Sequence, residues 1–209
     1  MSNEVLYLLL TFTTLLGALG AYKLGKTWLI GYMLICAFFA WFTVSKVVNI
    51  FGFPITCSAP LYTVLFLITD MLNERYGPQT GRRAVLMSLT GLVVLAVFAK
   101  LITMMAPAAN AESASQAFNT ILDTSMRVTV AGWISYLVFQ NFDVWLFNKL
   151  RTITNGTHLW LRNNISTFTS ATLDSYFFFF VAFYGTYDNW YAIATTVLVV
   201  KLIFAALDT

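Results

Sequence analysis

Ala84-Val-Leu-Met-Ser-Leu-Thr-Gly-Leu-Val-Val-Leu-Ala-Val-Phe-Ala-Lys-Leu-Ile-Thr-Met-Met105 is an apolar run in which Lys100 is the single charged residue. A helix needs about 20 mostly apolar residues to cross a bilayer, so this run predicts a membrane-spanning helix. The whole chain is apolar in the same way: 59% of its 209 residues are hydrophobic and 10% are charged, whereas soluble domains have about 25% charged residues. The composition indicates an integral membrane protein and excludes a soluble or a disordered chain.

Further runs of this kind bring the predicted spans to seven: residues 5–22, 27–49, 55–72, 84–105, 128–148, 165–184 and 190–207. The residues before Val5 include no Lys or Arg, whereas a signal peptide begins with a positive region, so the first run is interpreted as a retained helix. The sequence therefore predicts an all-α, polytopic membrane helix bundle that forms one transmembrane domain over residues 1–209.

Basic residues gather in alternate loops between these spans. Eight of the 12 lie in the first, third and fifth loops or at their edges: Lys23, Lys26, Arg75, Arg82, Arg83, Lys149, Arg151 and Arg162. Loops rich in Lys and Arg stay on the cytoplasmic side of a membrane. We therefore expect the N-terminus outside and the C-terminus inside.

The third span begins irregularly, because Gly52, Pro54 and Pro60 interrupt it. Proline removes a backbone donor, and unpaired backbone in lipid costs several kcal/mol. Two interpretations stay open: a broken helix of the kind that marks transport sites, or a loop followed by a short helix. Residues 106–124 are predicted to form a small, polar, external loop.

One polar face on the sixth span carries the clearest candidate site. Asp174 lies well inside the span and shares a helical face with Asn163, Thr167 and Ser170, at spacings of four, three and four residues. A charge at the bilayer centre costs about 2.5–3.5 kcal/mol, so intramembrane carboxylates usually line a cavity or form pairs. Helix–helix hydrogen bonding explains the Ser and Thr well, but it explains an aspartate poorly.

Two other spans carry candidates. On the fifth, Gln140 and Asp143 share a face. On the third, Asp70, Asn73 and Glu74 share a face. Carboxylates at this spacing repel unless a cation or a donor lies between them. Lys46, predicted to share a helical face with Phe42 and Asn49, and Lys201 are the cations that could pair with these carboxylates, since Lys100 and Arg127 are expected to reach the outer surface. The sequence does not assign the partners.

Other classes of function receive little support. The net charge of +3 is scattered between apolar runs, so a nucleic-acid partner is not expected. Cys36, Cys57 and His158 are too few for a closed zinc site, no cofactor is predicted, and no nucleophile lies beside a visible base, so we expect no enzyme. A passive channel would need a repeated pore motif, which is absent.

Two stretches carry a family resemblance. Asp70-Met-Leu-Asn-Glu-Arg-Tyr-Gly77 resembles the signature D-x-L-N-E-x-Y-G, and Trp160-Leu-Arg-Asn-Asn-Ile-Ser-Thr-Phe-Thr-Ser-Ala-Thr-Leu-Asp-Ser175 resembles W-L-R-N-N-x-S-T-x-x-S-Q-x-x-D-S. Both are similar to the queuosine precursor transporter family, also called the vitamin uptake transporter family. Ala171 stands where the family has Gln, which puts one amide contact in doubt.

The resemblance implies import of a 7-deazaguanine (7-cyano- or 7-aminomethyl-7-deazaguanine, or queuine) through the bacterial inner membrane, for salvage in tRNA modification. The lipid bilayer is then the other partner, and the oligomeric state is not indicated. The implied fold is similar to the six-helix substrate-binding subunits of energy-coupling-factor importers, with one helix added at the N-terminus.

The alternative is that the chain is itself such a binding subunit. These subunits dock through small-residue motifs, typically Ala-x-x-x-Ala, whereas the second span has Ala37 and Ala40 at a spacing of three.

Overall fold

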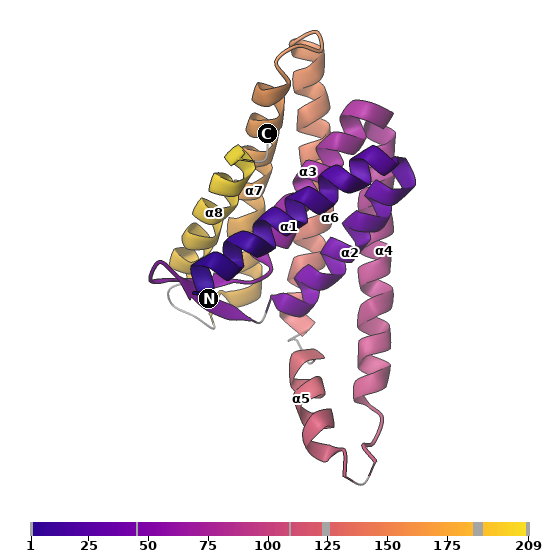
Figure 1. Cartoon of the computed structure of the whole chain (residues 1–209), viewed down its shortest axis with the longest axis vertical. Helices are drawn as coiled ribbons and strands as arrows, with labels where there is room; N and C mark the ends of the chain where they lie inside the picture. The colour runs from indigo at the N-terminus through magenta and orange to yellow at the C-terminus, as the bar shows by residue number, and fades with distance from the viewer. Residues whose placement is uncertain (1, 45, 109, 123–125, 186–189, 208–209) are drawn as a thin grey trace.

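The computed structural model describes residues 2–44, 46–108, 110–122, 126–185 and 190–207. Over these residues the chain forms eight helices and one two-stranded hairpin (Figure 1). The elements in chain order are α1 (Asn3–Leu24), α2 (Lys26–Thr43), β1 (Val47–Ile50), β2 (Phe53–Thr56), α3 (Ala59–Tyr76), α4 (Pro78–Thr103), α5 (Glu112–Leu122), α6 (Met126–Ile153), α7 (Leu159–Phe183) and α8 (Trp190–Leu207).

The seven predicted spans correspond to the seven long helices α1, α2, α3, α4, α6, α7 and α8, each of 18 residues or more. By length and composition, α1, α2 and α4 meet the requirement for crossing a membrane. Three others, α3, α6 and α7, carry polar residues on faces that the bundle buries. The prediction of an all-α membrane bundle is confirmed.

The predicted second span is too long, because α2 ends at Thr43 and a β-hairpin follows. Phe51 and Gly52 both have positive φ angles, 50° and 83°, as the two central residues of a type I′ turn require. Of the two interpretations for residues 51–60, the structure is closer to the loop and helix: α3 begins after the hairpin with Pro60 in its first turn, where proline is tolerated.

The predicted external loop is also corrected. Residues 112–122 within it form α5, and residues 109 and 123–125 lie outside the described part of the chain. Its side chains are mostly exposed, including Phe118 and Ile121, and Leu122 is buried.

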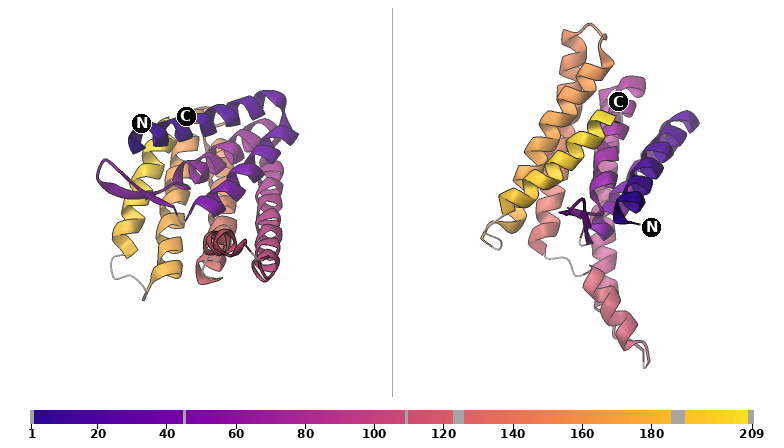
Figure 2. Two further views of the ribbon diagram at one scale, coloured as in Figure 1. Left: turned by 60° about the horizontal axis from the view of Figure 1, so that its bottom comes forward. Right: turned by 60° about the vertical axis from the view of Figure 1, so that its left-hand side comes forward.

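Helices α1 to α4 pack through an apolar core that small residues bring close together. Ala18, Ala37 and Ala40 are 0–3% exposed, and Tyr32 of α2 lies against Gly17 of α1. The views in Figure 2 show α1 running obliquely across one side of the bundle, with α7 and α8 side by side on another.

The basic residues of alternate loops meet at one end of the bundle, called here the basic end. Arg75, at the end of α3, donates to the carbonyl of Tyr22 near the end of α1, at 2.8 Å. Arg162, in the first turn of α7, and Arg151, in the last turn of α6, both lie against Glu74 of α3. These contacts fit the alternation of spans that the sequence predicts.

Candidate functional site

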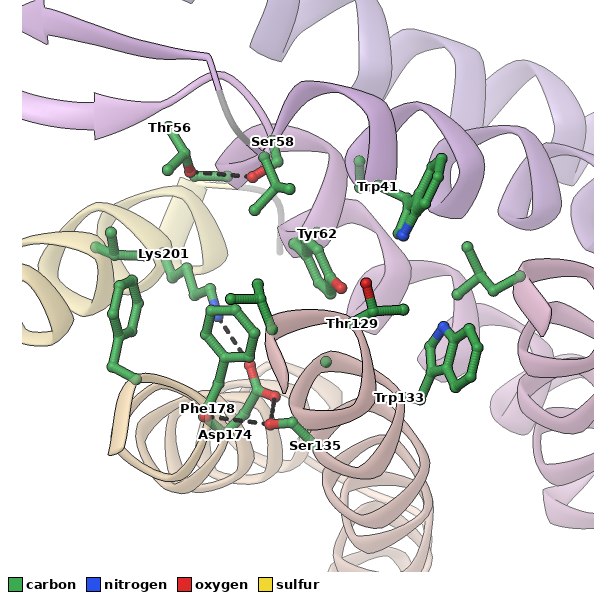
Figure 3. Close-up of a pocket in the computed structure, with 18 residues that line it drawn as sticks. Trp41, Thr56, Ser58, Tyr62, Thr129, Trp133, Ser135, Asp174, Phe178 and Lys201 are labelled. Carbon is green, nitrogen blue, oxygen red and sulfur yellow. Dashed lines mark hydrogen bonds and ion pairs between the residues drawn. The ribbon is translucent and has the colours of Figure 1, made fainter. Parts of the chain in front are cut away.

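A cavity lies among α2, α3, α6, α7 and α8, beside Thr56 at the end of strand β2 (Figure 3). About 70 Å³ of it is open to the centre of a water molecule, and about 760 Å³ is free of protein atoms when its opening to solvent is included. Much of its wall is aromatic: Trp41, Tyr62, Trp133, Phe178 and Phe179. Such walls suit a flat, apolar-faced ligand with a few polar edge groups.

A buried ion pair forms one polar side of the cavity. Nζ of Lys201 on α8 lies 2.8 Å from Oδ2 of Asp174 on α7, and each side chain is 9% exposed. Ser135 of α6 donates to Oδ1 of the same carboxylate at 2.6 Å, and Lys201 also donates to Ser175 Oγ at 3.1 Å. A carboxylate has about four acceptor positions, so Asp174 can accept further hydrogen bonds from a ligand.

Two indole N–H groups form the opposite polar side. The indole nitrogens of Trp41 on α2 and Trp133 on α6 point toward the same space, as does the hydroxyl of Tyr62 (Figure 3). Both indole nitrogens are buried, and neither has a hydrogen-bond acceptor among the described residues. A buried donor without an acceptor costs about 1–3 kcal/mol. An acceptor on a ligand would remove that cost.

A second polar cluster lies between α3, α6 and α7, on the side of the cavity nearer the basic end. Thr167 of α7 donates to Oδ2 of Asp70 at 3.4 Å, and Ser170 donates to Oδ1 of Asp143 at 2.7 Å. The predicted polar face of the sixth span is therefore the surface through which α7 contacts α3 and α6.

The cluster ends in an ion pair at the basic end. Arg162 is 1% exposed, and its two terminal nitrogens lie 3.2 and 3.5 Å from the carboxylate oxygens of Glu74. The guanidinium also lies over the ring of Phe147, 5.2 Å from its centroid. A two-pronged contact of this kind fixes orientation as well as charge, so it holds the start of α7 against the end of α3.

The ten residues predicted for the site fall into three groups. Asp174 lines the cavity. Eight more lie on α3, α6 and α7, and all of them are buried except Glu74, which is half-buried: Asp70, Asn73, Glu74, Gln140, Asp143, Asn163, Thr167 and Ser170. Gln140 donates to Thr69 of α3 at 3.1 Å.

Lys46 forms the third group by itself. It is exposed and lies between α2 and β1. The helical face that it was predicted to share with Phe42 and Asn49 is wrong, because α2 ends at Thr43 and Asn49 is in β1.

Sequence reasoning missed most of the cavity wall. Trp41, Trp133 and Ser135 carried no signal that separates them from other residues of apolar spans. Lys201 did carry one, because it is a cation inside a span, but its partner depends on how α7 and α8 pack.

Helices with apolar exteriors that enclose an aromatic cavity and buried charges indicate a polytopic membrane protein, and intramembrane charges of this kind are typical of transporters. Residues 56–209 match the family described as "Putative vitamin uptake transporter". The chain belongs to this family of membrane transporters.

Three curated relatives share the similarity. The chain is 32% identical over 182 residues to the "Probable queuosine precursor transporter" of Bacillus subtilis, which covers 86% of this chain and 78% of that protein. It is 28% identical over 149 residues to the "Queuosine precursor transporter" of Escherichia coli and 26% identical over 148 residues to the "Probable queuosine precursor transporter" of Haemophilus influenzae. These two matches cover 69% of this chain and 62% and 58% of the relatives. No solved structure matches the chain, so the likeness to energy-coupling-factor subunits stays a prediction.

Proposed function

We propose that this chain imports a queuosine precursor, a 7-deazaguanine, and binds the base in the cavity between Asp174 and the indoles of Trp41 and Trp133. The names of the three curated relatives support the substrate class. The observation that carries the proposal is the pairing of a buried carboxylate with two buried, acceptor-free N–H groups across one aromatic cavity.

The guanine-like edge of such a base offers two adjacent donors, N1–H and the 2-amino group. A carboxylate accepts from both, and Asp174 is the carboxylate that lines the cavity. Indole N–H groups only donate, so Trp41 and Trp133 suit acceptors such as O6 or the nitrogen of a 7-cyano group. Stacking of the planar ring on the aromatic wall contributes about 1–3 kcal/mol per base.

This arrangement also gives selectivity. A purine that lacks the 2-amino donor would leave part of the buried carboxylate unsatisfied, and buried polar groups left unpaired discriminate more strongly than a missing methylene does. A few polar groups in an apolar cavity therefore suffice to choose a guanine-like base.

We place the protein in the bacterial cytoplasmic membrane with the basic end inside. The proposal rests on the positive-inside rule and on the contacts that gather Arg75, Arg151 and Arg162 at one end. The N-terminus is then outside and the C-terminus inside.

The structure does not favour the role of an energy-coupling-factor subunit. Ala37 and Ala40, the small residues nearest to a docking motif, are 3% and 0% exposed and lie in the core that α2 shares with its neighbours. Residues buried there are not available to dock an ATPase module.

The test is uptake of labelled 7-cyano-7-deazaguanine by cells that cannot synthesise it. We expect wild type to take it up and Asp174→Ala and Asp174→Asn to lose uptake at equal membrane expression. Trp41→Phe and Trp133→Phe keep a ring and lose the N–H, so we expect affinity to fall about tenfold each, as one lost hydrogen bond of about 1.4 kcal/mol gives.

Trp145→Phe is the matched control, because Trp145 is on α6 like Trp133 but is 44% exposed. Its uptake should equal that of wild type. Normal uptake by the Asp174 variants would exclude this cavity as the site, and absence of uptake by wild type would exclude the substrate.

A further inference from the structure

The ammonium group of Lys201 has the surroundings of a bound cation inside the cavity. Its Nζ lies 2.8 Å from Oδ2 of Asp174 and donates to Oγ of Ser175 at 3.1 Å. The same nitrogen lies 5.7 Å from the centre of the Tyr62 ring, within the distance of a cation–π contact. A carboxylate, a hydroxyl and an aromatic face are groups that bind ammonium ligands, and here a lysine of the chain already uses all three.

This ion pair leaves the cavity without net charge. Among the described residues that line it, Asp174 and Lys201 are the charged ones, and their charges cancel. A charge without a partner is strongly disfavoured in buried surroundings. A cationic ligand that enters the cavity would leave either itself or Lys201 without a carboxylate.

The acceptor-free donors of the opposite wall also disfavour a cation. Nε1 of Trp41 and Nε1 of Trp133 are buried and have no acceptor among the described residues, and both point toward the cavity space (Figure 3). Indole N–H groups only donate, so their hydrogens repel an ammonium and attract a neutral acceptor such as a nitrile nitrogen. Both polar sides of the cavity therefore favour an uncharged ligand.

We propose that Lys201 is a specificity-determining residue: it fills the place of a ligand ammonium, so the cavity selects neutral bases over cationic ones. The inference rests on the proposed function and narrows its substrate. The 7-aminomethyl base and queuine carry an aliphatic amine, which is protonated at neutral pH as the lysine side chain is, whereas the 7-cyano base is neutral. The 7-cyano base is then the preferred precursor.

The first test needs no queuosine precursor. Lys201→Ala removes the ammonium and most of its stem, and propylammonium has the shape of the part removed. In detergent, propylammonium chloride should raise the midpoint of thermal unfolding of Lys201→Ala above its value in equal concentrations of 1-propanol and sodium chloride. Lys100→Ala removes an exposed cation on α4 and should show no difference between the two solutions. Equal midpoints of Lys201→Ala in both solutions would overturn the cation site.

The second test begins with wild type, so it does not depend on the folding of a variant. Isothermal titration calorimetry compares 7-deazaguanines that carry a cyano, a methyl or an aminomethyl group at position 7. The methyl base is neutral and has no acceptor there, so it separates the effect of charge from that of the nitrile. We expect the cyano base to bind most tightly and the aminomethyl base to bind about tenfold or more weakly than the methyl base, because its charge has no partner.

The variant Lys201→Met should change this order. It frees Asp174 to pair with a ligand, so the affinity of the aminomethyl base relative to the methyl base should rise about tenfold or more. Lys100→Met is the matched control and should keep the order of wild type.

The results distinguish this inference from the substrate proposal. Wild type that binds the aminomethyl base as tightly as the methyl base would overturn the role of Lys201, as would an unchanged ratio of the two affinities in Lys201→Met. If wild type binds none of the three bases, the substrate proposal is refuted, and the response of Lys201→Ala to propylammonium still decides whether Lys201 occupies a cation site.

Discussion

Neutralising either member of the Lys201–Asp174 pair should destabilise the protein more than neutralising both. The charged atoms are 2.8 Å apart and the side chains are 9% exposed, so with an effective dielectric constant of about 20 their attraction is about 6 kcal/mol, largely offset by desolvation. Removal of one partner leaves a buried, uncompensated charge and costs about 3–5 kcal/mol. Removal of both in Asp174→Asn/Lys201→Met leaves no buried charge, and most of that loss should be recovered.

The free energy of unfolding in detergent, measured for both single variants and the double variant, tests this expectation. Lys100→Met provides the control, because Lys100 is exposed on α4, and it should change little. Uptake of 7-cyano-7-deazaguanine should remain absent in the double variant, since asparagine does not restore the carboxylate. A double variant that loses the sum of the two single losses would refute the reasoning, because it would show that the two charges act independently.

Three further outcomes follow from the packing. Glu74→Gln should lower the free energy of unfolding more than Arg162→Met, because Gln leaves a buried guanidinium without its carboxylate, whereas the carboxylate of Glu74 is 35% exposed and can be hydrated; equal losses would contradict this. Gly17→Ala should destabilise the protein by about 1–3 kcal/mol, because the added methyl group would overpack against α2. Gly20→Ala should stabilise it by about 0.5–1 kcal/mol, because a methyl group there meets no atom within 4 Å. Unfolding in detergent measures both changes. Phe51→Asn should raise the midpoint of thermal unfolding, because Phe51 is 75% exposed with a positive φ angle that asparagine tolerates better; a lower midpoint would contradict the turn assignment.

Much of the fold could be predicted because the membrane requirement is local. A long apolar run specifies a helix wherever it occurs, and the position of basic residues in alternate loops fixes the number of crossings. The hairpin could not be predicted from hydropathy, since Val47-Val-Asn-Ile50 continues the apolar run before it. Its turn depends on Phe51 and Gly52 adopting positive φ angles, which the strand pairing on both sides enforces.

The candidate site, too, could be predicted only in part from the sequence. The polar face of α7 could be predicted because its residues follow the helical period, and the structure buries Asn163, Thr167, Ser170 and Asp174. The aromatic wall could not, because the chain contains 19 Phe, 10 Tyr and 6 Trp, and nothing local distinguishes Trp41 from the others. Only packing of separate helices decides which rings face one cavity.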